Sequence, residues 1–319
     1  MQRQIDLASE NGVDGFIFDT YIGRKDGRPV KEAIAPLDNA FLGSELGDFK
    51  FAIMSVLGSP RAVLPVPKDR GFEESGRYYD RTRGTIEEIV DHAVKNYWDE
   101  DNYIRMTGAN RPYMSLFTSD MRAVDYDSED DLTLPESIEY LKEYSYLKYR
   151  IEPYLAVVCL RASHALPLIE RGADAMTGYA FLPDFKGEPI QDYRKSIDQR
   201  ILDWDTISEQ ISKPYIPPVV VGWDASPRGY ADENTDIRDV AGLYPYTPIV
   251  EGANDMDFRR MLRLQRDYME RKSVPISERY TPITAWNEVT EGAALLPKVT
   301  RDGRLDKRLL EAVRDHKGR

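Results

Sequence analysis

Cysteine and histidine are scarce in this chain of 319 residues, which has one cysteine, Cys159, and three histidines, His92, His164 and His316. An intrachain disulfide needs two cysteines and is excluded. The histidines stand singly, without an HExxH motif or a pair at metal-ligand spacing, so a zinc-dependent hydrolase is disfavoured and we predict no metal site. Cys159 lies inside the apolar run LAVVCL, where we expect a buried thiol and not a nucleophile.

Long apolar runs and nucleotide-binding motifs are also missing. No stretch approaches the roughly 18 apolar residues that a membrane-spanning helix needs, and residues 1–12 lack the apolar centre of a signal peptide. The motifs GxSxG and GxxxxGK(S/T) do not occur, and no GxGxxG follows the first predicted strand. The usual signatures of acyl transfer, phosphoryl transfer and dinucleotide binding are therefore absent.

Positive charge is outweighed by negative charge. The chain has 43 lysines and arginines against 55 aspartates and glutamates, which gives a formal net charge of −12. This charge repels phosphate backbones and argues against nucleic acid or an anionic membrane surface as the main partner. A neutral ligand fits the balance better. Nothing in the sequence specifies an oligomeric state or a compartment.

Apolar, β-branched and aromatic runs of strand length alternate with helix-period segments along the whole chain. The clearest helical segments are 84–98, 134–149, 188–211, 255–271 and 304–316. The predicted strands are 14–19, 51–56, 112–117, 153–159, 174–181, 217–223 and 281–286. A βαβα order of this kind predicts a mostly parallel sheet, either doubly wound or closed into a barrel.

Loop lengths favour the barrel. Links from helix to strand are short, whereas links from strand to helix are long, at 57–83, 118–132, 180–188 and 224–254. A (β/α)8 TIM barrel has this asymmetry because its site is built from loops at the C-terminal ends of the strands. We therefore predict a single (β/α)8 domain over residues 1–319. Seven strands and a helix starting near residue 2 indicate that the first barrel strand is missing from this sequence or replaced by an unrecognised segment.

Carboxylates stand at the predicted ends of several strands. Asp19 closes the run GFIFD, Asp224 follows VVVGW, and Glu288 and Glu291 follow the last strand. In a barrel, all of these positions face the same mouth. The two glutamates could instead cap or solvate the next helix, since glutamate is favoured in a first helical turn.

Two carboxylates beside aromatic rings are suited to sugar chemistry. Cleavage of a glycosidic bond needs an acid for the departing oxygen and a second carboxylate that supports the anomeric centre or activates water. Trp223 and Trp286 end predicted strands, and their faces could stack on sugar rings. Two glutamates in a partly dry pocket cannot both ionise cheaply, so we expect a raised pKa on one of them, Glu291.

The segment TAWNEVTEGAALLP, residues 284–297, resembles the AWNEW-x-EG-x-x-LEP signature of glycoside hydrolase family 99-like proteins. These include endo-α-mannosidases and WbsX-type proteins of polysaccharide loci described as glycosyltransferases. RQIDLASENGVDGFIFDTY, DNYIRMTGANRPYMSLF and VVVGWDASPRG are similar to further segments of the family, in the same order. The chain departs from the signature at Val289, where the family has a second tryptophan, at Thr290, and at Leu296, where it has a glutamate.

The resemblance implies a (β/α)8 barrel whose first strand precedes the helix near residue 2. It also implies a retaining hydrolase of an α-linked glycan, in which Glu288 deprotonates the sugar 2-hydroxyl to form a 1,2-anhydro intermediate and Glu291 is the acid/base. No metal or cofactor is implied. The partner would be an oligosaccharide or polysaccharide, contacted by the remaining candidate residues. These are Asp19, Tyr21, Trp223, Asp224, Arg228, Trp286 and Asn287.

Three interpretations of the function stay open. The chain is a hydrolase, a non-catalytic carbohydrate-binding barrel, or a glycosyltransferase of polysaccharide biosynthesis. A transferase needs a donor site, and neither a suitable DxD-type loop nor a glycine-rich phosphate cradle is visible in the sequence. Arg228, four residues after Asp224, either binds substrate or pairs with Asp224.

Overall fold

The architecture is that of a computed structural model, which describes residues 1–25, 28–57, 60–62, 64–67, 74–77, 81–106, 110–117, 132–180, 182–230, 244–300 and 302–318. Of the predicted long loops, residues 118–131 and 231–243 and parts of 57–83 lie outside these ranges.

A curved, mostly parallel sheet forms the centre of the molecule. Its parallel strands follow one another in space in the order of the sequence. They are β1 (Gly15–Lys25), β3 (Lys50–Val56), β8 (Arg111–Phe117), β9 (Tyr154–Val158), β10 (Ala175–Thr177) and β12 (Tyr215–Ile216). Two further strands, β13 (Val219–Val220) and β17 (Ile283–Thr284), form a separate parallel pair. Runs such as YLAVV in β9 are buried at every position, as expected for parallel strands covered on both faces.

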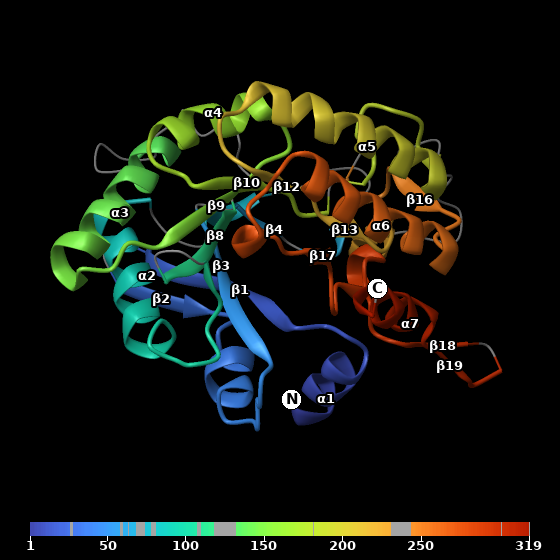
Figure 1. Cartoon of the computed structure of the whole chain (residues 1–319), viewed down its shortest axis with the longest axis horizontal. Coiled ribbons are helices and arrows are strands. Elements are labelled where there is room, and N and C mark those ends of the chain that lie inside the picture. Colours follow the sequence, from blue (N-terminus) through green and yellow to red (C-terminus); the bar gives the residue numbers. More distant parts are fainter. Residues whose placement is uncertain are drawn as a thin grey trace.

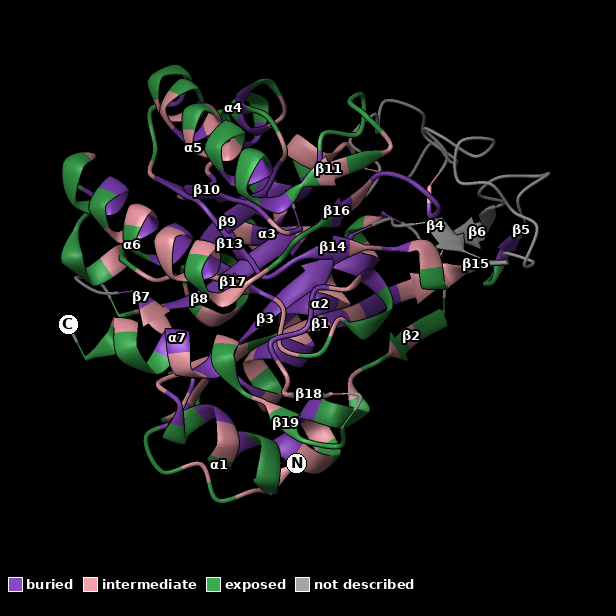
Figure 2. Cartoon of the chain, turned by 90° about the vertical axis from the view of Figure 1, so that its right-hand side faces the viewer, coloured by how far each residue is buried: buried purple, intermediate pink, exposed green. Residues whose placement is uncertain are grey.

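Helices surround this sheet (Figure 1). They are α1 (Gln2–Glu10), α2 (Arg83–Asn96), α3 (Leu134–Tyr149), α4 (Ala162–Glu170), α5 (Tyr193–Gln210), α6 (Asp255–Arg271) and α7 (Arg308–Lys317). Local chemistry sets several starts: Thr133 and Glu136 form a capping box at α3, Asp192 caps α5 and Asn254 caps α6. Figure 2 shows that the central parallel strands are mostly buried and that the helices around them carry exposed residues on their outer faces.

Short elements complete the chain. They are β2 (Arg28–Glu32), a π-helical turn (Pro36–Phe41), β4 (Pro60–Ala62), β5 (Val66–Pro67), β6 (Glu74–Arg77), β7 (Arg105–Met106), β11 (Ile190–Asp192), β14 (Trp223–Asp224), β15 (Gly229–Tyr230), β16 (Ile249–Glu251), β18 (Lys298–Val299), β19 (Leu305–Asp306) and the 3-10 turns η2 (Ser226–Arg228), η4 (Ile276–Glu278) and η5 (Val289–Glu291).

The predicted mixed α/β fold with a mostly parallel sheet is confirmed, and each predicted strand and helix overlaps an observed one. The arrangement is compatible with a TIM-like barrel. Among the described residues, β17 pairs with β13, and no ladder joins it to β1. The segment 217–223 is broken into β13 and the start of β14.

The placement of Asp19 at the end of a strand was wrong. Parallel pairing with β3 stops at Thr20, but β1 continues to Lys25 because β2 adds an antiparallel ladder from Tyr21 onward. Asp19 and Tyr21 therefore lie within a longer strand, near the C-terminal end of its parallel part.

A largely buried ion-pair network joins β8, β9 and the segment before β10 to α3. The Asp174 carboxylate accepts a bidentate pair of hydrogen bonds from Arg111, at 2.9 and 2.7 Å. It also accepts hydrogen bonds from the Lys142 ammonium group, at 3.1 Å, and from the Leu155 backbone N–H, at 3.0 Å. Burial alone would raise the pKa of Asp174, but these bonds and charges outweigh it and lower the pKa.

We expect Asp174→Asn to lower the free energy of unfolding by about 1.5–3 kcal/mol at pH 7, the range for a hydrogen bond to a charged group. Because the folded-state pKa is depressed, this stabilisation is fully present above the unfolded pKa and is lost as the pH falls through the folded one. Urea unfolding at several pH values measures it, with the exposed Asp48→Asn as control. An equal loss for both variants at pH 7 would contradict the expectation.

Candidate active site

The turn after β17 holds Glu288 and Glu291 on a tightly folded stretch of backbone. The Ala293 N–H donates to the Glu288 carbonyl at 2.9 Å, and the Ala285 N–H donates to the Ala293 carbonyl at 2.8 Å. Gly292 closes the turn with φ of +64°, a left-handed conformation that favours glycine. The chain thus doubles back directly after the strand and presents both glutamates from one short turn.

Close backbone packing brings this turn against β14. A Cβ atom on Gly292 would lie 2.9 Å from the backbone nitrogen of Asp224, and one on Gly222 would lie 3.0 Å from the Gly292 carbonyl oxygen. Only residues without a side chain allow this approach. The two glycines therefore place the segment from Trp223 to Arg228 beside the glutamates.

Asp224 shapes the turn that carries Arg228. Its carboxylate oxygen Oδ1 accepts hydrogen bonds from the Ser226 N–H at 3.0 Å and from the Ser226 hydroxyl at 2.6 Å. The interpretation that Arg228 pairs with Asp224 was therefore wrong, because Arg228 instead contacts the two glutamates. Its Nη1 donates to Glu291 Oε1 at 2.6 Å, and its Nη2 donates to Glu288 Oε1 at 3.0 Å.

Two further side chains, Tyr244 and Thr290, complete this group. Arg228 donates from Nη1 to the Tyr244 hydroxyl at 2.8 Å and from Nε to the Thr290 hydroxyl at 3.0 Å. Those hydroxyls in turn donate to the glutamates: Tyr244 to Glu291 at 3.2 Å and Thr290 to Glu288 at 2.7 Å. We call these five residues, Arg228, Tyr244, Glu288, Thr290 and Glu291, the Arg228 cluster.

Burial distinguishes the two glutamates. The side chain of Glu291 is 9% exposed, and that of Glu288 is 26% exposed. Burial raises the pKa of Glu291; the positive charge of Arg228 opposes this rise and the negative charge of Glu288 adds to it. The net direction is upward, as expected from the sequence for the acid of the pair.

Asp19 is a third carboxylate near the pair. Burial, followed by the negative charges of Glu288 and Glu291, raises the pKa of Asp19 to about 7. Among the described residues, no hydrogen-bond donor or cation contacts its carboxylate. Because side chains alternate along a strand, Asp19 and Tyr21 project from the face of β1 opposite to Phe18 and Thr20.

Tyr179, shortly after β10, belongs to the same region. Burial, and then the charges of Asp19, Glu288 and Glu291, raise the pKa of its phenol, and Tyr21 contributes as well. The end of the parallel part of β1 and the segments that follow β10 and β17 thus bring their polar side chains into one electrostatic neighbourhood.

We expect Asp19→Asn to stabilise the fold above pH 7. The folded-state pKa lies above the unfolded one, so the folded chain binds the extra proton between about pH 4 and 7 and its stability falls as the pH rises through that window. The asparagine variant escapes this loss, which is on the order of 4 kcal/mol for a pKa that rises from 3.8 to about 7. Urea unfolding at pH 4 and pH 8 tests this: the gain should appear only at pH 8, and an equal gain at both would contradict it.

The remaining predicted contact residues lie in different surroundings. Trp223 is buried, with its ring edge-on to the exposed Phe185 at 5.8 Å. The Trp286 indole packs on Phe16 at 5.1 Å and donates to Gln4 of α1 at 3.1 Å, contacts that tie β17 to the N-terminal segment. Asn287 is exposed beside Glu288. Sugar contacts by these residues stay predictions.

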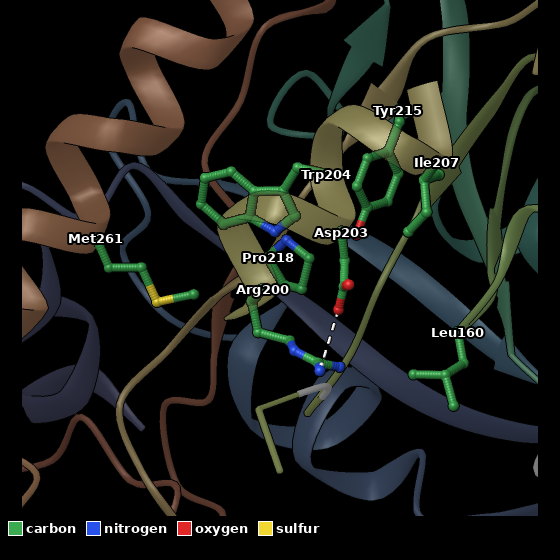
Figure 3. Close-up of a pocket in the computed structure, with 8 residues that line it drawn as sticks. All are labelled: Leu160, Arg200, Asp203, Trp204, Ile207, Tyr215, Pro218 and Met261. Carbon is green, nitrogen blue, oxygen red and sulfur yellow. Dashed lines mark ion pairs between the residues drawn. The ribbon is translucent and has the colours of Figure 1, made fainter. Parts of the chain in front are cut away.

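A small cavity between α5, α6 and the sheet is separate from this site (Figure 3). It has a volume of about 20 Å³, enough for one water molecule and too small for a sugar ring. Its polar lining is the ion pair of Arg200 with Asp203, at 3.0 Å. No member of the Arg228 cluster lines it.

Within the described part of the chain, no group of three or more histidine, cysteine, aspartate or glutamate side chains is arranged to hold a metal ion. In the same part, no helix has the length and apolar character that crossing a membrane requires.

The fold is similar to that of the GH99 endo-alpha-mannosidase from Bacteroides thetaiotaomicron. A structure of that protein in complex with BIS-TRIS-propane superposes with a TM-score of 0.59 and 14% sequence identity, covering 99% of this chain and 82% of the mannosidase chain. A second structure of it gives a TM-score of 0.58 and 14% identity, with 99% and 77% covered. No family model and no curated protein matches the sequence. At this identity the likeness concerns the fold.

Proposed function

We propose that this chain is a (β/α)8-barrel glycoside hydrolase that cleaves an α-linked glycan with retention, in the manner of an endo-α-mannosidase. The observation that carries the proposal is the pair Glu288 and Glu291, presented from one turn after β17 and bridged by one arginine. The similarity of the fold to an endo-alpha-mannosidase supports it.

Glu291 is the acid/base in this proposal. Its burial and raised pKa favour the protonated form, which is the form that donates a proton to the departing glycosidic oxygen. Glu288, which is more exposed, is the base for the sugar 2-hydroxyl. Asp19 and Tyr179 lie near enough to the pair to feel its charge, and with Tyr21 they would bind sugar hydroxyls.

The bonds balance in two steps. First, Glu288 takes the 2-hydroxyl proton, O2 bonds to C1 to give the 1,2-anhydro sugar, and the C1–O bond to the leaving group breaks as Glu291 protonates that oxygen. Water then attacks C1 while Glu291 takes its proton, the C1–O2 bond breaks, and Glu288 returns the proton to O2. Two inversions at C1 give net retention.

A panel of α-linked mannans and bacterial O-polysaccharides tests the activity. The wild-type chain should release new reducing ends from at least one of them. Release from none of them, in the presence of measurable glycan binding, would favour the second candidate, a carbohydrate-binding barrel. The observation that favours this second candidate is the Arg228 cluster itself, because one oxygen of each glutamate is already occupied.

A further inference from the structure

The guanidinium group of Arg228 occupies the space between the two glutamates and uses all three of its nitrogen atoms. Nη1 and Nη2 each reach one glutamate, and Nε reaches the Thr290 hydroxyl. A guanidinium is planar and rigid, so its two terminal nitrogens fix the separation of the carboxylate oxygens that they bind.

Neighbouring groups fix the orientation of Arg228 in turn. The Tyr244 hydroxyl and the Thr290 hydroxyl accept hydrogen bonds from it, and the Asp224–Ser226 contacts shape the turn that carries it. With 22% of its side chain exposed, Arg228 is largely withdrawn from solvent. Arg228 is therefore held in a fixed orientation within the site.

The second oxygen of each glutamate is left open. Arg228, Tyr244 and Thr290 all bind the Oε1 atoms, and among the described residues no donor reaches Oε2 of Glu288 or of Glu291. One oxygen of each acid is thus anchored, and the other has no hydrogen-bond donor among the described residues.

We propose that Arg228 is a positioning residue, which holds Glu288 and Glu291 at a fixed separation and leaves the Oε2 oxygens for proton transfer. This rests on the proposed function and goes beyond it, because Arg228 acts through the two glutamates and not on the glycan. Its charge also offsets the repulsion between the carboxylates, so its removal raises the pKa of Glu291 further.

Steady-state kinetics of Arg228→Gln and Arg228→Lys test the proposal, with the exposed Arg263→Gln on α6 as control. Arg228→Gln should lower kcat by about 100-fold, the cost of a misplaced catalytic group, with little change in KM. The alkaline limb of the pH–rate profile of Arg228→Gln should move to higher pH, because Glu291 stays protonated up to a higher pH. Arg228→Lys keeps the positive charge but loses the two-pronged hydrogen bonding of the guanidinium group. Its alkaline limb should therefore lie near that of the wild type, while kcat stays low. A raised KM with unchanged kcat would show direct substrate binding and overturn the proposal.

A titration without substrate separates this inference from the proposed function. Carbon-13 NMR of glutamate-labelled protein, assigned with Glu288→Gln and Glu291→Gln, follows the two carboxylates directly. Arg228→Gln should shift the Glu291 titration to higher pH in a chain that melts like the Arg263→Gln control. An unchanged titration of Glu291 would overturn the inference even if the wild type cleaves glycans. A shifted titration in a chain that cleaves no glycan would contradict only the proposed function.

Discussion

Glu291→Gln is expected to lower kcat for hydrolysis of an α-linked glycan by roughly 10²–10⁴-fold, the usual contribution of a general acid/base. Glutamine fills the same volume and can still bind Arg228 and Tyr244 through its carbonyl oxygen, so the turn and the bound glycan should keep their positions. What it cannot do is donate the proton that the leaving oxygen needs. KM should therefore change little.

The dependence on the leaving group gives this prediction its sharpest form. An aryl α-glycoside with an acidic phenol departs without protonation, so Glu291→Gln should recover much of the rate of the first step with that substrate. The exposed Glu143→Gln on α3 is the control and should behave as wild type with both substrates. Equal glycan turnover by Glu291→Gln and Glu143→Gln would contradict a catalytic role for Glu291.

Glu288→Gln is expected to cause a loss of similar size, about 10²–10⁴-fold in kcat, for a different reason. Without a base for the 2-hydroxyl, the 1,2-anhydro sugar does not form, whatever the leaving group. The aryl glycoside should therefore not rescue this variant.

A comparison of the two variants on the two substrates assigns the roles. Rescue of Glu291→Gln alone supports the role of Glu291 as acid/base and of Glu288 as base. Rescue of Glu288→Gln alone would reverse them, and a wild-type rate for Glu288→Gln on the natural glycan would contradict any catalytic role for Glu288.

The strands and the position of the glutamates could be predicted from the sequence because both are local signals. Apolar runs of strand length mark β3, β8 and β9, and the two glutamates follow directly after an apolar run in a segment that contains Gly292. The extension of β1 beyond Asp19 depends on pairing with β2, and the continuing apolar residue Ile22, which is fully buried, was its signal.

The partners of the glutamates could not be predicted in this way. Arg228 lies 60 residues before Glu288 in the chain, and Tyr244 lies 47 residues before Glu291, so tertiary packing, including the close approach of Gly222 and Gly292, brings them together. Tyr179 could not be predicted as a site residue because nothing in the sequence distinguishes it from the other tyrosines, of which the chain has 20 in all. Its position after β10 depends on where β10 ends, at Thr177.

A proton NMR time course of the hydrolysis of an α-linked mannan oligosaccharide by the wild-type chain tests the central claim most directly. The α-anomer of the new reducing end should appear first and mutarotate afterwards, with no such signal from Glu291→Gln. Initial release of the β-anomer, or release at the same rate by the variant, would contradict it.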